Sequence, residues 1–119
     1  DVVAEVAGFL RERIAAAEAA GITKERIAID PGFGFGKTLT HNLALLRELE
    51  KLAGLGVPVL AGLSRKAMLG TITGRDVGDR VAASIAAALI AVQHGASIVR
   101  VHDVRETVDA LKIWNAIKL

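Results

Sequence analysis

Apolar residues recur at helical spacing over the first twenty positions of the chain. One face of a helix over residues 2–20 carries Val3, Val6, Leu10, Ile14 and Ala17. The charged residues at 11–13 lie mostly off that face. Gly21 follows an alanine run and is typical of a glycine just past a helix end, with Ile22 covering that end. The pattern therefore predicts an amphipathic helix that ends near residue 20.

The chain then alternates between short apolar runs and helical patterns. The runs, which we interpret as buried strands, are 27–29, 57–61 and 97–101. Helices are predicted over 40–52, over 79–93 and from Asp103 onward, and the polar stretch 70–78 is interpreted as a loop. This order predicts parallel strands joined by right-handed crossovers. Near-continuous apolar strands favour a sheet covered on both faces. An open doubly wound sheet and a segment of a (β/α)₈ barrel both fit.

The last helix is predicted to have a buried face and a capped start. Its apolar stripe consists of Val104, Val108, Leu111 and Ile117, joined by Trp114. Asp103 stands three residues before Glu106, a spacing that resembles a capping box. The stripe predicts the buried face of this helix, and the Asp103–Glu106 spacing predicts where it starts.

Composition narrows the class of protein. Of 119 residues, 52% are hydrophobic and 24% charged, which is typical of a globular domain. The absence of cysteine excludes disulfides and thiolate metal sites, and we expect a cytoplasmic location. Fifteen basic and thirteen acidic residues are interspersed, so nucleic-acid binding is not expected, and no apolar run is long enough to span a membrane. The chain begins without Met inside a helical pattern, so we expect further residues upstream.

A glycine-rich loop follows the first predicted strand, over residues 30–38. It does not match a P-loop, because Pro31 stands where that motif needs a glycine. It does not match a dinucleotide fingerprint either, because Lys37 stands where that motif needs a glycine. The carboxylate of Asp30 could instead accept paired N–H groups from a planar heterocycle such as a 2-aminopyrimidinone. Phe33 or Phe35 could form a wall beside such a ring. The alternative is a tight turn with both phenyl rings in the core.

Polar residues also follow the other two predicted strands. Lys66 could contact carbonyl or ring-nitrogen acceptors, and Ser64 and Arg65 could meet a carboxylate or phosphate. The alternative is a solvated loop in which Ser64 caps a helix. Arg100 and His102 share one face of a strand and suit an anion such as pyrophosphate. Here the alternative is an ion pair of Arg100 with Asp103, with His102 at a turn.

No metal site is expected from the residues of the chain itself. The three histidines are isolated and give no metal-ligand spacing, so His41 and His94 are interpreted as surface residues. Arg75, Asp76 and Asp79 are interpreted as loop or cap charges. The spacing therefore predicts a planar, polar and anionic ligand, bound by side chains from three strand ends.

Three ordered strings together resemble the dihydropteroate synthase family, the targets of sulfonamides. They are DPGFGFGK at 30–37, GLSRK at 62–66 and RVHDV at 100–104. The resemblance covers essentially the whole chain and implies a (β/α)₈ TIM barrel, which needs about 250 residues. Residues 1–119 would form the C-terminal part of this pterin-binding domain, a helix followed by three βα units.

The resemblance also implies a reaction. The family condenses 6-hydroxymethyl-7,8-dihydropterin pyrophosphate with para-aminobenzoate and releases 7,8-dihydropteroate and pyrophosphate. Pyrophosphate is thought to leave before the amine attacks. Mg²⁺ is expected in the whole enzyme, with its ligand outside this chain, because the corresponding Asn lies on the first strand of the barrel. The mobile loops after the first two strands also lie outside it.

Roles for individual residues follow from the resemblance. The pterin is assigned to Asp30, Phe33, Gly62, Lys66 and Arg100. The para-aminobenzoate and sulfonamide pocket is assigned to Phe35, Ser64, Arg65 and Lys66. Pyrophosphate is assigned to Arg100 and His102, and the catalytic residues are expected to be Lys66, Arg100 and His102.

An incomplete barrel is expected to be inactive, or nearly so, on its own. Three strands cannot close an eight-stranded barrel, and exposed edges invite association. Family members form homodimers, and residues 79–93 and 104–117 are the expected surfaces. Two other interpretations remain: a non-catalytic phosphate- or nucleotide-binding module built on Lys37, and a structural half-barrel that only assembles with a partner chain.

Overall fold

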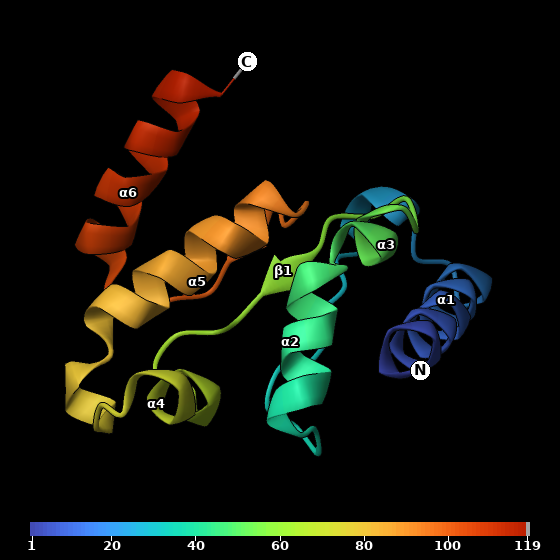
Figure 1. Cartoon of the computed structure of the whole chain (residues 1–119). Helices are drawn as coiled ribbons and strands as arrows, with labels where there is room; N and C mark the ends of the chain where they lie inside the picture. Colours follow the sequence, from blue (N-terminus) through green and yellow to red (C-terminus); the bar gives the residue numbers. More distant parts are fainter. Residues whose placement is uncertain (119) are drawn as a thin grey trace.

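The computed structural model describes residues 1–118 and shows a helix-rich α/β arrangement (Figure 1). The α-helices are α1 (Val2–Ala19), α2 (Leu39–Arg47), α3 (Glu50–Ala53), α4 (Ala67–Thr73), α5 (Val81–Gln93) and α6 (Val104–Ile117). The strands are β1 (Leu60–Ala61) and β2 (Ile98–Val99). Short 3₁₀ turns lie at Lys24–Arg26 and Val77–Asp79. The predicted alternation of strands and helices is therefore confirmed in its order.

The strands are parallel, as predicted, but shorter than the apolar runs. In β1 and β2, Leu60 pairs with Ile98 and Ala61 with Val99. The predicted strand at 27–29 is reduced to one parallel bridge between Ile29 and Val59. Among the described residues, Ile29 and β2 each pair only with the segment that contains β1. The backbone hydrogen-bonding groups on their other side are therefore unpaired within the described part of the chain.

The two faces of this small sheet differ in burial. Ile29, Val59 and Ala61 point to one face and join the main core, each at most 5% exposed. On the opposite face Ile98 is 42% exposed and Leu60 is only half-buried. The expectation of a sheet covered on both faces is therefore wrong for residues 1–118. Helices against one face and an open second face are what a barrel segment presents, since that second face lines the barrel interior.

Helix α1 confirms the predicted amphipathic helix and its glycine end, but Ile22, which was expected to cover that end, is 44% exposed. Val3, Leu10 and Ile14 are buried on its inner face. Its C-terminus is closed by Gly21, which has a φ of 97°. The N–H of Ile22 reaches back to the carbonyl of Ala17, and that of Gly21 to the carbonyl of Glu18. This pattern is a Schellman motif, so the glycine was correctly interpreted.

The predicted helix 40–52 is divided in two, and one further helix was missed. The chain leaves α2 at Glu48 and turns into α3, and both Leu49 and Leu52 are fully buried. Helix α4 occupies part of the stretch interpreted as a loop. It is short, and its anchors, Met68 and Leu69, precede a glycine and two threonines. A helix of seven residues with a glycine in its middle is too short to show a recognisable helical period.

Helix α6 is less buried than its sequence predicts. It packs mainly on α5 and lies at the end of the arrangement opposite to α1 (Figure 1). Val104 and Ile117 are 59% and 67% exposed, whereas Leu111 and Trp114 are half-buried. The predicted buried face is therefore wrong for the described residues, because α5 covers only one side of the helix. The capping prediction is also wrong, since the side chain of Asp103 makes no cap hydrogen bond.

Candidate functional site

Polar side chains from all three strand ends gather at one edge of the sheet. Leu60 and Ile98 are register partners, so the residues two positions further along, Gly62 and Arg100, also lie on the open face. Ser64 and His102 continue this alternation. A hollow of about 120 Å³ is lined by Gly62, Ser64, Lys66, Arg100, Val101 and His102. The predicted convergence of strand ends is confirmed as geometry.

Asp30 and Arg100 form an ion pair across the middle strand. Arg100 Nη1 donates to Asp30 Oδ2 at 3.2 Å, and the other carboxylate oxygen accepts the N–H of Gly32 at 2.8 Å. The guanidinium passes directly over Gly62, where a Cβ atom would lie 2.3 Å from Arg100 Nη2. Only a residue without a side chain leaves room for this path.

Lys66 reaches from the second loop into the first. Its ammonium group donates to the carbonyl of Phe33 and lies 5.0 Å from the centre of the Phe35 ring. Partial burial is the main cause that lowers the pKa of Lys66. The Asp30 carboxylate opposes this shift, whereas the positive charge of Arg100 adds to it. The site thus holds a cation that gives up its proton more easily than an ordinary lysine.

The two phenylalanines of the glycine loop have different surroundings. Phe33 is fully buried in the core, so only its backbone carbonyl faces the site. Phe35 is 72% exposed and carries its ring beside Lys66. The structure therefore combines the two interpretations of this loop: one ring belongs to the core and the other is free to border a ligand.

The glycine loop is held by its own chain. The ammonium of Lys37 donates to the carbonyls of Gly32 (2.9 Å) and Phe35 (3.1 Å), and the N–H of Gly34 donates to Asn42 Oδ1 at 2.9 Å. Asn42 is only 3% exposed. Sequence analysis missed Asn42, because it follows two other polar residues, Thr40 and His41, in the first turn of the helix. Lys37 is thus occupied within its loop, which favours a structural role over a phosphate-binding one.

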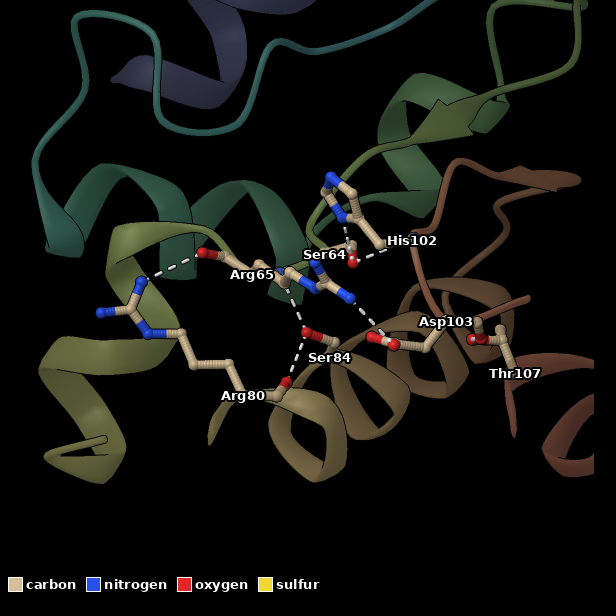
Figure 2. Close-up of polar contacts among 7 residues, drawn as sticks. All are labelled: Ser64, Arg65, Arg80, Ser84, His102, Asp103 and Thr107. Atoms are coloured by element: carbon tan, nitrogen blue, oxygen red, sulfur yellow. Dashed lines mark hydrogen bonds and ion pairs between the residues drawn. The ribbon is translucent and has the colours of Figure 1, made fainter. Parts of the chain in front are cut away.

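The second and third loops are joined by two side-chain contacts. Ser64 Oγ lies 2.8 Å from His102 Nδ1 and accepts the backbone N–H of His102 at 3.2 Å. Arg65 Nη2 donates to Asp103 Oδ1 at 3.0 Å (Figure 2). The alternative pairing of Arg100 with Asp103 is wrong, since each has another partner. Ser64 meets a histidine rather than capping a helix.

The remaining histidines and loop charges lie away from this edge. His41 caps the start of α2 with Thr38, and His94 pairs with Glu50 at 2.9 Å. Asp76 and Asp79 are exposed near the 3₁₀ turn. Within residues 1–118 no group of three or more potential ligands gathers closely enough to hold a metal ion. None of the helices among these residues has the length and apolarity that crossing a membrane requires.

The arrangement has a definite chemical character. Lys66, Arg100 and His102 line the hollow, and the Asp30 carboxylate is joined to it through its ion pair with Arg100. The exposed ring of Phe35 lies beside Lys66. A carboxylate can read paired N–H donors of a planar ring, and the cations can stabilise negative charge nearby. The site therefore suits a ligand that combines a flat hydrogen-bonding ring with an anionic group.

The chain is similar to proteins of known family along its whole length. Residues 1–102 match the family described as pterin binding enzyme. The dihydropteroate synthase of Neisseria meningitidis serogroup C is 56% identical, and the match covers 98% of this chain and 42% of that protein. The chain thus spans less than half the length of this relative.

Solved structures give the same result. The dihydropteroate synthase of Stenotrophomonas maltophilia is 65% identical with a TM-score of 0.96, covering 98% of this chain and 44% of that one. The synthase of Xanthomonas albilineans, solved in complex with 7,8-dihydropteroate, is 61% identical with a TM-score of 0.97, covering 98% of this chain and 45% of that one. Fold and sequence agree over nearly every residue: the chain belongs to the pterin binding enzyme family, with the fold of the matching portion of the dihydropteroate synthase barrel.

Proposed function

We propose that residues 1–119 are the C-terminal part of a dihydropteroate synthase, within its pterin-binding TIM-barrel domain. The whole enzyme would join 6-hydroxymethyl-7,8-dihydropterin pyrophosphate to para-aminobenzoate and release pyrophosphate. The observation that carries this proposal is the Asp30–Arg100 pair across Gly62, beside Lys66 and His102. The Xanthomonas albilineans relative has been solved with 7,8-dihydropteroate and with 4-aminobenzoic acid, a product and a substrate of this reaction.

Asp30 is proposed to read the pterin. Its carboxylate would accept two N–H groups from the pyrimidine edge of the ring, a pairing that one carboxylate can make with both oxygens. Lys66 and Arg100 would contact the same ring from the neighbouring strand ends, and Gly62 would form the floor of the slot. Phe33 would take part only through its carbonyl, because its side chain is buried.

Arg100 and His102 are proposed to hold the leaving pyrophosphate. Negative charge on that group grows as its bond to the pterin methylene breaks, and a fixed guanidinium stabilises it most at that moment. Ser64 Oγ accepts the backbone N–H of His102. The Ser64 hydroxyl proton is then free to be donated to Nδ1 of the His102 ring. Nε2 would then carry the imidazole proton, and this N–H would donate a hydrogen bond to a phosphate oxygen.

Para-aminobenzoate is proposed to lie beside Phe35, with Arg65 and Lys66 near its carboxylate, and sulfonamides would compete there. Mg²⁺ is proposed to take part in the whole enzyme, with its protein ligand outside residues 1–119. A cytoplasmic homodimer is proposed for the whole enzyme. Its contact would use α5 and α6, on which Ile90 and Ile113 are exposed.

A completed barrel tests the proposed function. In a chimera, called here the completed enzyme, the part of the Stenotrophomonas maltophilia synthase that precedes the matched region is fused to residues 1–119. We expect it to release pyrophosphate when both substrates and Mg²⁺ are added, because residues 1–119 are 65% identical to the segment that they replace. Residues 1–119 alone should release little or none.

Other outcomes of this experiment would support the rival functions. A folded chimera without activity, with nucleotide affinity that Lys37→Ala abolishes, would establish a nucleotide-binding module instead. A chimera that binds neither nucleotide nor pterin would leave only the structural half-barrel. The contacts of Lys37 with its own loop carbonyls argue against the first of these.

Aminobenzoate affinity should depend on pH through Lys66. A carboxylate bound beside its ammonium favours the protonated lysine, so affinity is full below the lowered pKa of Lys66 and falls as pH rises through it. This window lies below the ordinary lysine value of 10.5. Calorimetric titrations of the completed enzyme across alkaline pH would show the fall. In Lys66→Arg the fall should disappear, because a guanidinium keeps its proton; an unchanged alkaline fall would contradict the assignment.

A further inference from the structure

Arg65 has an unusual backbone conformation next to the site. Its φ is 59°, and within residues 1–118 it is the only non-glycine residue with a positive φ. A long side chain in this region costs free energy, so the surrounding structure must hold it there. Its neighbours along the chain are Ser64 and Lys66, both of which line the hollow. The conformation of Arg65 therefore sets where these two side chains point.

Helix α5 and its N-cap residue, Arg80, hold the two backbone groups of Arg65. Its N–H donates to Ser84 Oγ at 2.9 Å, and its carbonyl accepts a hydrogen bond from Arg80 Nη1 at 3.0 Å (Figure 2). The Ser84 hydroxyl in turn donates to the carbonyl of Arg80. Ser84 is only 5% exposed, so its hydroxyl has little access to water and is committed to these contacts.

The side chain of Arg80 reaches Arg65 through a gap that a glycine provides. A Cβ atom on Gly70 of α4 would lie 2.2 Å from Arg80 Nη2. On the way, Arg80 Nε donates to the carbonyl of Arg75 at 3.1 Å. One guanidinium therefore joins the turn after α4 to the loop that carries Ser64 and Lys66.

Neither Arg80 nor Ser84 lines the hollow, so any effect on the reaction must act through the loop. We propose that Arg80 and Ser84 are positioning residues of the aminobenzoate pocket. By holding Arg65 in the left-handed region, they direct its guanidinium to Asp103 and place Lys66 beside Phe35. This inference rests on the proposed function, and it adds two residues to which sequence analysis gave no role.

The test compares two hydroxyls in the completed enzyme. Ser84→Ala removes the acceptor for the Arg65 N–H. We expect the KM for para-aminobenzoate to rise about tenfold, the effect of roughly one lost hydrogen bond, with the KM for the dihydropterin substrate changed less. Thr71→Ala is the matched control. Thr71 makes the same kind of bond to a carbonyl one turn back, that of Ala67 at 3.1 Å, but receives nothing from the loop.

A second pair of variants addresses Arg80. Gly70→Ala places a methyl group where the guanidinium lies, and Arg80→Met removes the guanidinium itself. Both should raise the KM for para-aminobenzoate more than the KM for the dihydropterin substrate, in the same proportion as Ser84→Ala does. Variants that lower the Tm but leave the ratio of the two KM values unchanged would show a merely structural role and overturn the proposal.

Amide hydrogen exchange separates this inference from the proposed function. Exchange at residues 63–67 should be faster in Ser84→Ala and Arg80→Met than in Thr71→Ala, because the loop loses its anchors. Unchanged exchange would overturn the proposal whether or not the chimera is active. A chimera with no activity but with faster exchange would refute the proposed function, and with it the assignment of the pocket, while still showing that the loop is held from α5.

Discussion

The completed enzyme with Asp30→Asn should lose almost all of its activity. The substitution keeps the shape of the side chain but removes the charge that pairs with Arg100 and would accept two pterin N–H groups. Charged hydrogen bonds contribute about 1.5–3 kcal/mol each, so we expect kcat/KM to fall roughly 100- to 1000-fold. Steady-state rates of pyrophosphate release would measure this effect.

The control for Asp30 is another carboxylate. Asp76→Asn makes the same chemical change at an exposed position, where the side chain makes no cap hydrogen bond to the 3₁₀ helix that follows it. Its kcat/KM should stay at the value of the unmodified enzyme. If Asp30→Asn also kept its activity within about threefold, which is less than one charged hydrogen bond contributes, the assignment of Asp30 to the pterin would be wrong.

The second large effect is expected from Gly62→Ala. One methyl group would occupy the place of the Arg100 guanidinium, which would have to leave Asp30. Because the displaced group is the end of a flexible side chain, the fold should survive while the site loses its ion pair. We expect kcat/KM to fall about 100-fold, the loss of roughly one charged contact, with a small change in Tm.

A double-mutant cycle separates steric displacement from general damage. Once Arg100→Ala has removed the guanidinium, Gly62→Ala should cost little more, so the two effects should be far from additive. Gly8→Ala is the matched control, since a Cβ there meets nothing within 4 Å. Additive losses at Gly62 and Arg100 would show that the methyl group acts by another route.

The edge at which the site lies was predictable from sequence because topology alone decides it. Parallel strands joined by helices bring their carboxyl ends together, so Asp30, Ser64 and Arg100 had to lie near one another. Their individual partners were not predictable. Arg65 pairs with Asp103 across 38 positions, and Arg100 with Asp30 across 70. Such pairings depend on strand twist and loop path, which no local pattern records.

The missed residues share a physical reason. Asn42 and Ser84 are each a single buried polar residue on a helix. Each accepts a hydrogen bond from a backbone N–H group of a distant loop. A helical pattern shows only that they interrupt an apolar face. The apolar face of α6 failed for the opposite reason: the pattern is present, but residues 1–118 contain no element that covers it. Hydrophobic periodicity predicts that a face is to be buried, not which segment buries it.

The ion pair between Asp30 and Arg100 also has a consequence for selectivity. In the free site the two groups already pair with each other, at the position proposed for the pterin ring and the pyrophosphate. A ligand with only paired N–H donors would bind the carboxylate and leave the guanidinium without its partner. A ligand with only an anionic group would bind the guanidinium and leave the carboxylate without its partner. A molecule that carries both exchanges one complete set of partners for another. If the proposed function holds, we expect the resting pair to disfavour molecules that match only one of its two groups.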